Sequence, residues 1–592
     1  MIDRLYQQGQ TSLIDRLYQQ GQTSLKKINS IKMGTDLFEK IDSVKEDDLP
    51  KTFKLLTWVY FLATLHSMHA IFERNIRALG ANSCVQHLSA FHTTANQLVL
   101  VEARNGEAVP AWRDSEGHNH PFHSMVDPWR EAHRIVDTVQ SDCIVALGMG
   151  GAFILTTFLE QHRDSVLIII EYNTALCAEL FHLKDFSLLL SDKRVLFLLD
   201  PSPSTIEQTI IRSYQPMLHG TIQTMPLHTR IALDPPSFQH ASAALHQAID
   251  TVAHDYSVQA LFGKKWFLNI IRNVRYFPAA PKHIPHVAVA AVCGAGPSLE
   301  EQIPVLIEKH ADYCIIATDT SFPVLMQAGI QPDAVIAVDA QYISYQHFLG
   351  FSPFSIPLFV DLAIAPTVSS CAADIHFFAS QHPLCQYFSR RLAIPTVDCS
   401  GANVSYAAVS VAEMLGATRI DLYGTDFSYP WGKSYARGTY LSAQYAVQQS
   451  RLKPIEHLFS TVLYRSSLQK IKKGNEWYYE TKLLKRYRLL LEEKSKRLSA
   501  VLNAVPGSGA PIHVTVIPQK RYNSWIEKTN QSGYTVLKQY YSALLDLSDP
   551  EVCETLLPVA AALQRENPHN YGQPLLESAR SYCLNEIKKL LS

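Results

Sequence analysis

One phrase near the middle of the chain limits the fold most strongly. Residues 287–310 read VAVAAVCGAGPSLEEQIPVLIEKH, which is a run of small and β-branched residues, a glycine turn and an amphipathic helix. Gly294 and Gly296 allow a tight turn, and Pro297 and Ser298 suit the start of a helix. Because the N–H groups and dipole of a helix N-terminus favour an anion, the phrase predicts a nucleotide-phosphate site at the edge of a parallel sheet. A strand–turn–helix with no ligand is the alternative interpretation.

Further short apolar runs follow this phrase and alternate with helical segments. The runs are 313–319, 333–339, 357–362, 375–380, 395–401 and 419–427, and IHVTVI at 512–517 is expected to add a last strand. Strands of continuous apolar residues are typical of a parallel sheet that is covered on both faces. The segment from 286 to 520 is therefore predicted to form a Rossmann-like domain.

Polar residues are expected to meet where these strands end, because the ligand crevice of an open parallel sheet lies at the carboxyl ends of its strands. The predicted binding residues are Gly294, Ala295, Gly296, Ser298, Asp319, Asp339, Ser400, Gly401, Gly424 and Asp426. Each of them has a structural alternative, such as a helix cap or a plain turn. The loop that follows, 429–437, suits a lid, because its tyrosines can donate to a phosphate and Lys433 or Arg437 can neutralise one.

An earlier α/β region carries a weaker version of the same pattern. The strand and turn at 143–151 precede two strands that end in Glu171 and Asp200, as in dinucleotide-binding folds. The turn Gly148-Met149-Gly150-Gly151 is shorter than the full fingerprint, so a scaffold is predicted in preference to a ligand site. The nearby histidines 118, 120 and 123 lack a matching Cys or carboxylate and are interpreted as solvated loop residues.

Length and charge limit the class of protein. A chain of 592 residues predicts several domains, and a net charge of −1 gives no global field toward nucleic acid or membrane lipid. The ten scattered cysteines include no C-x-x-C pair and fit a reducing, cytoplasmic location. The apolar run 55–72 contains polar residues and is too short for a bilayer, so no membrane insertion is expected. An exact repeat of twelve residues at 2–13 and 14–25 is interpreted as a duplication in a tail.

The predicted fold class is α/β, with two Rossmann-like parallel-sheet domains in tandem and a helical C-terminal region. The expected parts are an N-terminal extension with the repeat at 1–70, an N-terminal α/β domain at 71–265, a linker at 266–285, a central catalytic domain at 286–520 and a helical region at 521–592.

Four core segments together resemble one protein family. They are GAGPSL, ATDTSFPVLMQAGIQPDAVIAVDA, CSGANVSYAAVSVAEMLGATRIDLYGTDF and SYARGTY, and their order is similar to that of the motility accessory factor (Maf) flagellin glycosyltransferases. HSMVDPWREA, LGMGGAF and IIEYN resemble the N-terminal domain of that family, so the resemblance covers about 72–520. The central domain of the family is similar to bacterial sialyltransferases.

The sialyltransferase likeness implies a role for each predicted residue. Gly294, Gly296, Ser298, Ser400, Gly401, Gly424 and Asp426 match positions that hold the nucleotide, and Asp319 and Asp339 stand where those enzymes use asparagine. Tyr429 and Tyr435 match tyrosines that bond the departing phosphate, although this loop is one residue longer before each. His457 lies roughly where the base is expected, and Glu456 is the rival base. The enzymes resembled need no cofactor, but a Mg²⁺ ion between Asp339 and phosphate oxygens is an alternative, since a carboxylate otherwise repels phosphate.

The resemblance implies transfer of a nonulosonic acid, of the pseudaminic or legionaminic type, from a CMP-activated sugar to Ser or Thr of flagellin. The expected partners are flagellin and the nucleotide-activated sugar, with no nucleic acid. Two alternatives stay open. One is a flagellin-binding chaperone or assembly factor with a degenerate nucleotide site, and the other is an enzyme like 6-hydroxymethylpterin diphosphokinase that holds Mg²⁺–ATP.

Overall fold

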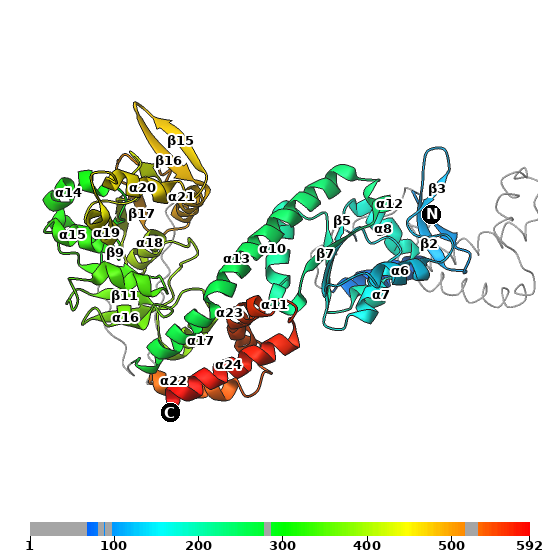
Figure 1. The fold of residues 1–592 in the computed structure, drawn as a ribbon. Coiled ribbons are helices and arrows are strands. Elements are labelled where there is room, and N and C mark those ends of the chain that lie inside the picture. Colours follow the sequence, from blue (N-terminus) through cyan, green and yellow to red (C-terminus); the bar gives the residue numbers. More distant parts are fainter. Residues whose placement is uncertain (1–67, 81–87, 89–96, 278–285, 515–530) are drawn as a thin grey trace, which may run out of the picture. The chain divides into compact units, whose positions relative to one another are not determined.

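The computed structural model describes residues 68–80, 88, 97–277, 286–514 and 531–592 (Figure 1). The chain divides into two compact units, Met1–Asp255 and Tyr256–Ser592. The division falls inside the long helix α13 (Pro235–Arg275), which also runs through part of the predicted linker. The tandem repeat, and with it most of the predicted extension at 1–70, lies outside the described residues. No helix among the described residues is long and apolar enough to cross a membrane.

The first unit contains the expected parallel sheet and one sheet that the sequence did not predict. Four parallel strands follow the order β6-β5-β4-β7, with helices between them along the chain. Earlier in the sequence, β1, β2 and β3 pair in an antiparallel sheet. The strands are β1 (Leu98–Glu102), β2 (Ala108–Arg113), β3 (Asn119–Pro121), β4 (Cys143–Leu147), β5 (Val166–Glu171), β6 (Val195–Leu199) and β7 (Ile222–Pro226). The helices that precede α13 are α6 (Pro128–Val136), α7 (Phe153–Gln161), α8 (Thr174–Leu183), α9 (Ser187–Leu190), α10 (Pro203–Ser213), α11 (Pro216–His219) and α12 (His228–Ile231).

The second unit is built on a seven-stranded parallel sheet in the order β12-β11-β10-β9-β8-β13-β17. From β8 the chain moves outward through β9 to β12, and then returns to place β13 on the other side of β8. This reversal marks the topological switch point, where ligands of open α/β sheets bind. The strands are β8 (Val289–Cys293), β9 (Cys314–Thr318), β10 (Ala334–Ala337), β11 (Leu358–Asp361), β12 (Ile375–Phe378), β13 (Arg419–Tyr423) and β17 (Val501–Ala504).

Both faces of this sheet are buried, which explains why its strands are continuously apolar. Along β8, Ala290 and Val292 face a core that α18 (Val404–Met414) completes, whereas Ala291 and Cys293 face a core with α14 (Leu299–Glu308). Adjacent residues of a strand point to opposite faces, so each must be apolar when helices cover both. The remaining elements that connect these strands are η2 (His310–Asp312), α15 (Phe322–Gln327), η3 (Tyr342–Phe348), α16 (Pro366–Ser369), α17 (Pro383–Leu392), α19 (Tyr440–Gln448), α20 (Ile455–Leu463) and α21 (Lys482–Ser495).

Two predicted strands differ from the structure. In 395–401, Thr396 makes only an isolated bridge to Ala379. The last strand is β17, since residues 512–514 form no strand and 515–517 lie outside the described part. The prediction at 512–517 followed the more apolar segment, but the strand beside β13 is half-exposed, as an edge strand is.

A small antiparallel sheet and three helices complete the second unit. The sheet has the order β14-β16-β15, from β14 (Tyr429–Pro430), β15 (Leu468–Lys473) and β16 (Glu476–Thr481). The helical C-terminal region consists of α22 (Gly533–Ala543), α23 (Pro550–Glu566) and α24 (Gln573–Leu591). It packs on α17, where Tyr387 contacts the Tyr540 ring and Arg391 pairs with Glu551. The predicted fold class, two parallel-sheet domains in tandem with a helical C-terminal region, is confirmed.

Candidate functional site

The glycine turn after β8 lies directly against the turn after β13. Gly294 N–H donates to the Tyr423 carbonyl and Gly296 N–H to the Gly424 carbonyl, both at 2.8 Å. A Cβ at Gly294 would come within 2.6 Å of the Gly424 oxygen, so the close approach of two backbones requires glycine here. The turns after β8 and β13, both predicted to belong to the site, therefore lie against each other. The N–H groups of Gly294 and Gly296 are hydrogen-bonded within the chain.

A side chain from elsewhere in the protein accepts a hydrogen bond from the N-terminus of α14. Ser298 N–H donates to Oδ2 of Asp426 at 2.9 Å, and a Cβ on Gly296 would lie 2.4 Å from the same oxygen. Ser298 and Asp426 are both buried, and desolvation raises the pKa of the Asp426 carboxyl. The carboxylate stands where the sequence predicted a phosphate, so a phosphate at this helix end would have to displace it.

The predicted lid loop is held down over the glycine turn. Ala436 N–H donates to the Ala295 carbonyl at 3.0 Å, and Ala436 is fully buried. Glu300, in the first turn of α14, accepts from the Arg437 N–H at 2.8 Å and lies 3.3 Å from Lys433 Nζ. Lys433 was predicted to neutralise a phosphate, but in this arrangement its charge is paired with Glu300.

A second group of predicted residues converges after β9 and β10. Asp319 is buried and its carboxylate accepts from the Thr320 N–H at 2.7 Å. Desolvation raises the pKa of Asp319, while the charge of His347 opposes that rise and the charge of Asp339 adds to it. Burial therefore favours the neutral carboxyl, which can donate a hydrogen bond much as an asparagine would.

His347 was missed by the sequence analysis. It belongs to the short helix η3 after β10, is 8% exposed, and packs edge-on against the Tyr440 ring at 4.6 Å. Its Nδ1 is buried and has no hydrogen-bond partner among the described residues. A buried polar nitrogen without a partner costs free energy, so a bound ligand that bonds to it would relieve that cost. The sequence YISYQHF offers no spacing that would have marked it.

The tyrosines of the lid loop belong to the same cluster. Tyr435 keeps 36% of its surface exposed, yet desolvation of its hydroxyl, together with the charges of Tyr429, Tyr440 and Asp319, raises its pKa to about 12. Desolvation also raises the pKa of Tyr429. Both hydroxyls therefore stay protonated and can donate to an anion over the ordinary pH range. Among the predicted residues, the charges of Tyr429 and Asp319 act on Tyr435, and the charge of Asp339 acts on Asp319.

The variant Asp319→Asn is expected to be more stable than wild type at neutral pH. Because the folded state raises the pKa of Asp319, the wild type loses stability as the pH climbs from the unfolded pKa through the folded one, and an asparagine at this position cannot ionise. The gain in free energy of unfolding should be present at about pH 7 and vanish below about pH 4, the unfolded range of an aspartate. Urea unfolding of both proteins across this range measures it. A variant less stable than wild type at neutral pH would contradict the account.

Ser400 and Gly401 lie in a different network. Ser400 Oγ donates to Asp398 Oδ1 at 2.6 Å, and Asp398 Oδ2 accepts from Tyr406 at 2.8 Å and from Lys494 at 2.9 Å. The bonds from Ser400 and Lys494 outweigh desolvation and lower the pKa of Asp398. A Cβ on Gly401 would lie 2.1 Å from the Tyr406 ring. Among the described residues no hydrogen bond or ion pair joins this network to Asp319, Asp339 or Tyr435.

The two predicted bases lie on the surface. His457 and Glu456 are exposed in the first turn of α20. Their side chains make no described hydrogen bond or ion pair with the other predicted site residues. Asp339, the predicted Mg²⁺ ligand, is half-buried and accepts from the Gln341 N–H at 2.9 Å. The described residues contain no group of three or more His, Cys, Asp or Glu arranged to hold a metal ion.

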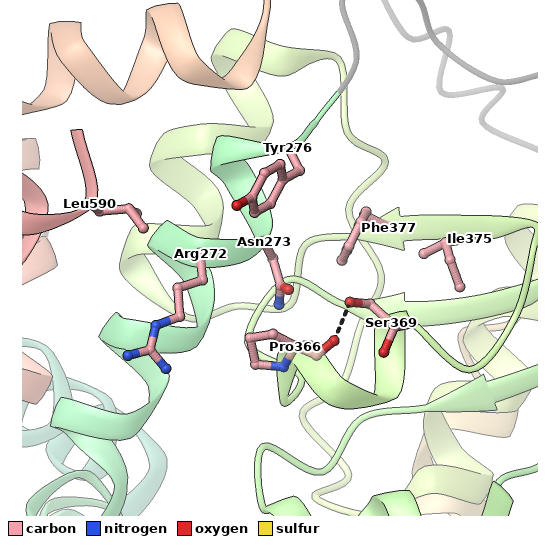
Figure 2. Close-up of a pocket in the computed structure, with 9 residues that line it drawn as sticks. Arg272, Asn273, Tyr276, Pro366, Ser369, Ile375, Phe377 and Leu590 are labelled. Carbon is pink, nitrogen blue, oxygen red and sulfur yellow. Dashed lines mark hydrogen bonds between the residues drawn. The ribbon is translucent and has the colours of Figure 1, made fainter. Parts of the chain in front are cut away.

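A cavity of about 560 Å³ lies elsewhere in the second unit (Figure 2). It is lined by Arg272, Asn273, Tyr276, Pro366, Ser369, Ser370, Ile375, Phe377 and Leu590. None of the predicted site residues belongs to it. Asn273 uses its amide to hold the carbonyls of Leu362 and Ile364, so this lining residue already supports the turn after β11.

The glycine turn of the first unit is closed by neighbouring side chains. Glu171 is buried, accepts from the Met149 N–H at 2.5 Å and pairs with Arg230 at 3.0 Å. Gly151 N–H donates to Nε2 of His123, whose side chain is 2% exposed. These contacts occupy the groups that a dinucleotide would need, which favours the scaffold interpretation.

The prediction of a solvated histidine is wrong for His123, because the turn buries it, whereas exposed His118 and His120 pair with Asp114.

The amino-acid sequence matches one protein-family model and several known proteins. A family model described as 6-hydroxymethylpterin diphosphokinase MptE-like matches residues 268–432. An uncharacterized protein of Treponema pallidum is 37% identical over 175 residues, which are 29% of this chain and 83% of that protein. A second one from the same organism is 31% identical over 175 residues, 28% of this chain and 61% of its own length. The chain thus spans less than two thirds of that second relative.

A solved structure extends the likeness to most of the chain. The structure of the MAf glycosyltransferase from Magnetospirillum magneticum AMB-1 aligns with a TM-score of 0.52 over 89% of this chain and 95% of that one, at 14% sequence identity. The predicted resemblance to the motility accessory factors is therefore confirmed at the level of the fold. The chain belongs to the same protein family as its Treponema pallidum relative and has the fold of a Maf glycosyltransferase.

Proposed function

We propose that this chain is a glycosyltransferase that moves a nonulosonic acid, of the pseudaminic or legionaminic type, from a CMP-activated donor to Ser or Thr of flagellin. The observation that carries the proposal is the cluster of Tyr429, Tyr435, Asp319 and His347 at the carboxyl edge of the sheet, in a chain with this fold. A fold alone does not set an activity, so the chemistry of the cluster bears the argument.

The cluster suits departure of a phosphate from a sugar. The bond between the anomeric carbon and the phosphate oxygen breaks, and both electrons leave with CMP. Hydroxyl groups of Tyr429 and Tyr435, which stay protonated because their pKa values are raised, donate to the charge that develops on the phosphate. Burial raises the pKa of Asp319 and so disfavours the ionised form, which would repel that charge.

The acceptor hydroxyl then bonds to the anomeric carbon and gives its proton to a base. Within this proposal His347 takes that proton, because it is buried in the cluster and its Nδ1 has no partner among the described residues. His457 and Glu456, the bases implied by the resemblance, are exposed on α20 and become the weaker candidates. The donor identity, the flagellin acceptor and an absence of cofactor all belong to the proposal.

A second candidate function rests on the family model over 268–432, which is described as that of a pterin diphosphokinase. Two assays on the purified chain separate the candidates. The proposal expects CMP release from a CMP-nonulosonate that accelerates when flagellin is added. It expects no AMP from ATP, Mg²⁺ and 6-hydroxymethylpterin. AMP formation without CMP release would reverse the assignment, and neither product, with flagellin still bound, would favour a chaperone.

A further inference from the structure

The charge of the chain is distributed unevenly in the second unit. Residues 465–488 contain eight lysines and arginines against two glutamates, in a chain whose net charge is −1. Six of these basic residues are exposed: Arg465, Lys470, Lys472, Lys482, Lys485 and Arg486. Of the two glutamates, Glu480 is buried against Arg488, and only Glu476, at the hairpin turn, is exposed. This concentration makes a local positive field for an anionic partner.

The register of the small sheet places part of this charge on the same face as a predicted catalytic tyrosine. Lys470 pairs with Tyr479, and Tyr479 pairs with Tyr429 on the other side of β16. Residues paired across antiparallel strands share a face, so these three lie in one row. Lys472 and Trp477 form the next pair on that face, because side chains two positions apart point the same way. We call Tyr429, Lys470, Lys472, Trp477 and Tyr479 the hairpin face.

The two faces of the small sheet have different surroundings. On the opposite face Tyr478 and Pro430 are buried, and Glu480 pairs with Arg488 of α21. On the hairpin face Trp477 is 44% exposed, and Lys470 Nζ lies 4.6 Å from the centre of its ring. One face therefore packs on the unit and the other offers an aromatic and basic surface to solvent.

The hairpin is anchored near its turn, and β15 lies at the edge of the small sheet. Lys473 Nζ donates to the carbonyls of Gly507 and Gly509 at 2.6 and 2.7 Å, which fixes the hairpin next to the Asp426 turn. In the order β14-β16-β15, strand β15 is an edge, and within the described part of the chain no further strand pairs with it. Figure 1 shows β15 and β16 projecting beyond the helices of the second unit. Such an edge can accept an extended peptide as an additional strand.

We propose that the hairpin face and the free edge of β15 bind an extended acidic segment of the acceptor polypeptide and lead it toward Tyr429. This rests on the proposed transfer to a protein. The edge offers main-chain hydrogen bonds, Lys470 and Lys472 complement carboxylates, and the face ends at the tyrosine of the transfer site. Main-chain pairing favours a polypeptide over nucleic acid, which would use the charge and the aromatic rings but not the strand edge.

The test uses the full-length chain and a fluorescein-labelled acidic peptide of Asp, Ser, Thr and Gly. Charge reversal in the double variant Lys470→Glu/Lys472→Glu is expected to weaken peptide binding by about tenfold or more. The double variant Lys193→Glu/Lys588→Glu changes the net charge equally at exposed lysines outside the face and should bind like wild type. A peptide with Asn in place of Asp should bind weakly to all three proteins.

Two outcomes would overturn the inference. One is equal peptide affinity in wild type and Lys470→Glu/Lys472→Glu, and the other is an oligothymidylate that binds more tightly than the peptide and loses affinity in the same variant. Trp477→Ala, which keeps the charge, should also weaken peptide binding. This variant distinguishes binding to the hairpin face from a purely electrostatic effect.

The reaction of the sugar donor is measured in a separate assay. CMP release without flagellin should be unchanged in Lys470→Glu/Lys472→Glu, while the KM for flagellin rises about tenfold. If wild type releases no CMP at all, the proposed function fails, and the peptide measurement still decides whether the face binds an acidic chain.

Discussion

The variant Tyr435→Phe is expected to transfer sugar to flagellin about 10²–10³-fold more slowly than wild type, with little change in stability. The hydroxyl is the only group removed, and the account assigns it to the charge that develops on departing CMP. The loss should appear in kcat and in kcat/KM alike, because the interaction strengthens only as the bond breaks. Initial rates of CMP release in the presence of flagellin measure it.

The pH dependence of this loss follows from the pKa of Tyr435. Since the surroundings raise that pKa to about 12, the hydroxyl donates at every pH used for such assays, and the ratio of wild-type to variant rates should stay constant up to about pH 10. Tyr464→Phe, the same change at a tyrosine 71% exposed, should leave the rate unaltered. A Tyr435→Phe enzyme within a few fold of wild type would remove this hydroxyl from the mechanism.

The second large effect is expected at His347. Replacement by glutamine keeps the size of the side chain but removes a group that can accept a proton, and should slow transfer about 10²–10⁴-fold. The loss should appear in kcat and leave the KM for flagellin unchanged, because the base acts on the bound acceptor. A residue with a purely structural role would instead lower the thermal stability together with the rate.

His457→Gln and Glu456→Gln serve as matched controls for this base. Both side chains are exposed on α20, and each variant is expected to keep most of the wild-type rate. Thermal unfolding of His347→Gln checks that the buried contact with Tyr440 survives. Loss of activity in His457→Gln with activity retained in His347→Gln would return the role of base to α20.

The sequence predicted the central sheet well because its strands are buried on both faces. The apolar runs that become β8 to β11 end close to the ends of these strands. The acids Asp319 and Asp339 follow β9 and β10, as expected. Turn chemistry and apolar continuity are local properties, so one segment at a time is enough to recognise them. The same logic missed β15 and β16, because one face is exposed and carries lysines that obscure the alternation.

The partners inside the site were harder to predict, since they come from distant segments. Ser298 and Asp426 lie 128 positions apart, and Asp398 and Lys494 lie 96 apart. A glycine turn before a helix predicts an anion there, but nothing local says that the anion is the carboxylate of Asp426. His347 went unnoticed for the same reason, because its burial and its contact with Tyr440 involve a segment far away in the sequence.

The intact mass of flagellin tests the central claim most directly. Flagellin is produced in cells that make the CMP-nonulosonate, together with wild type, Tyr435→Phe or no partner. The account predicts that only wild type raises the flagellin mass fully, by whole multiples of one sugar residue. Flagellin of identical mass with wild type and with no partner would contradict it.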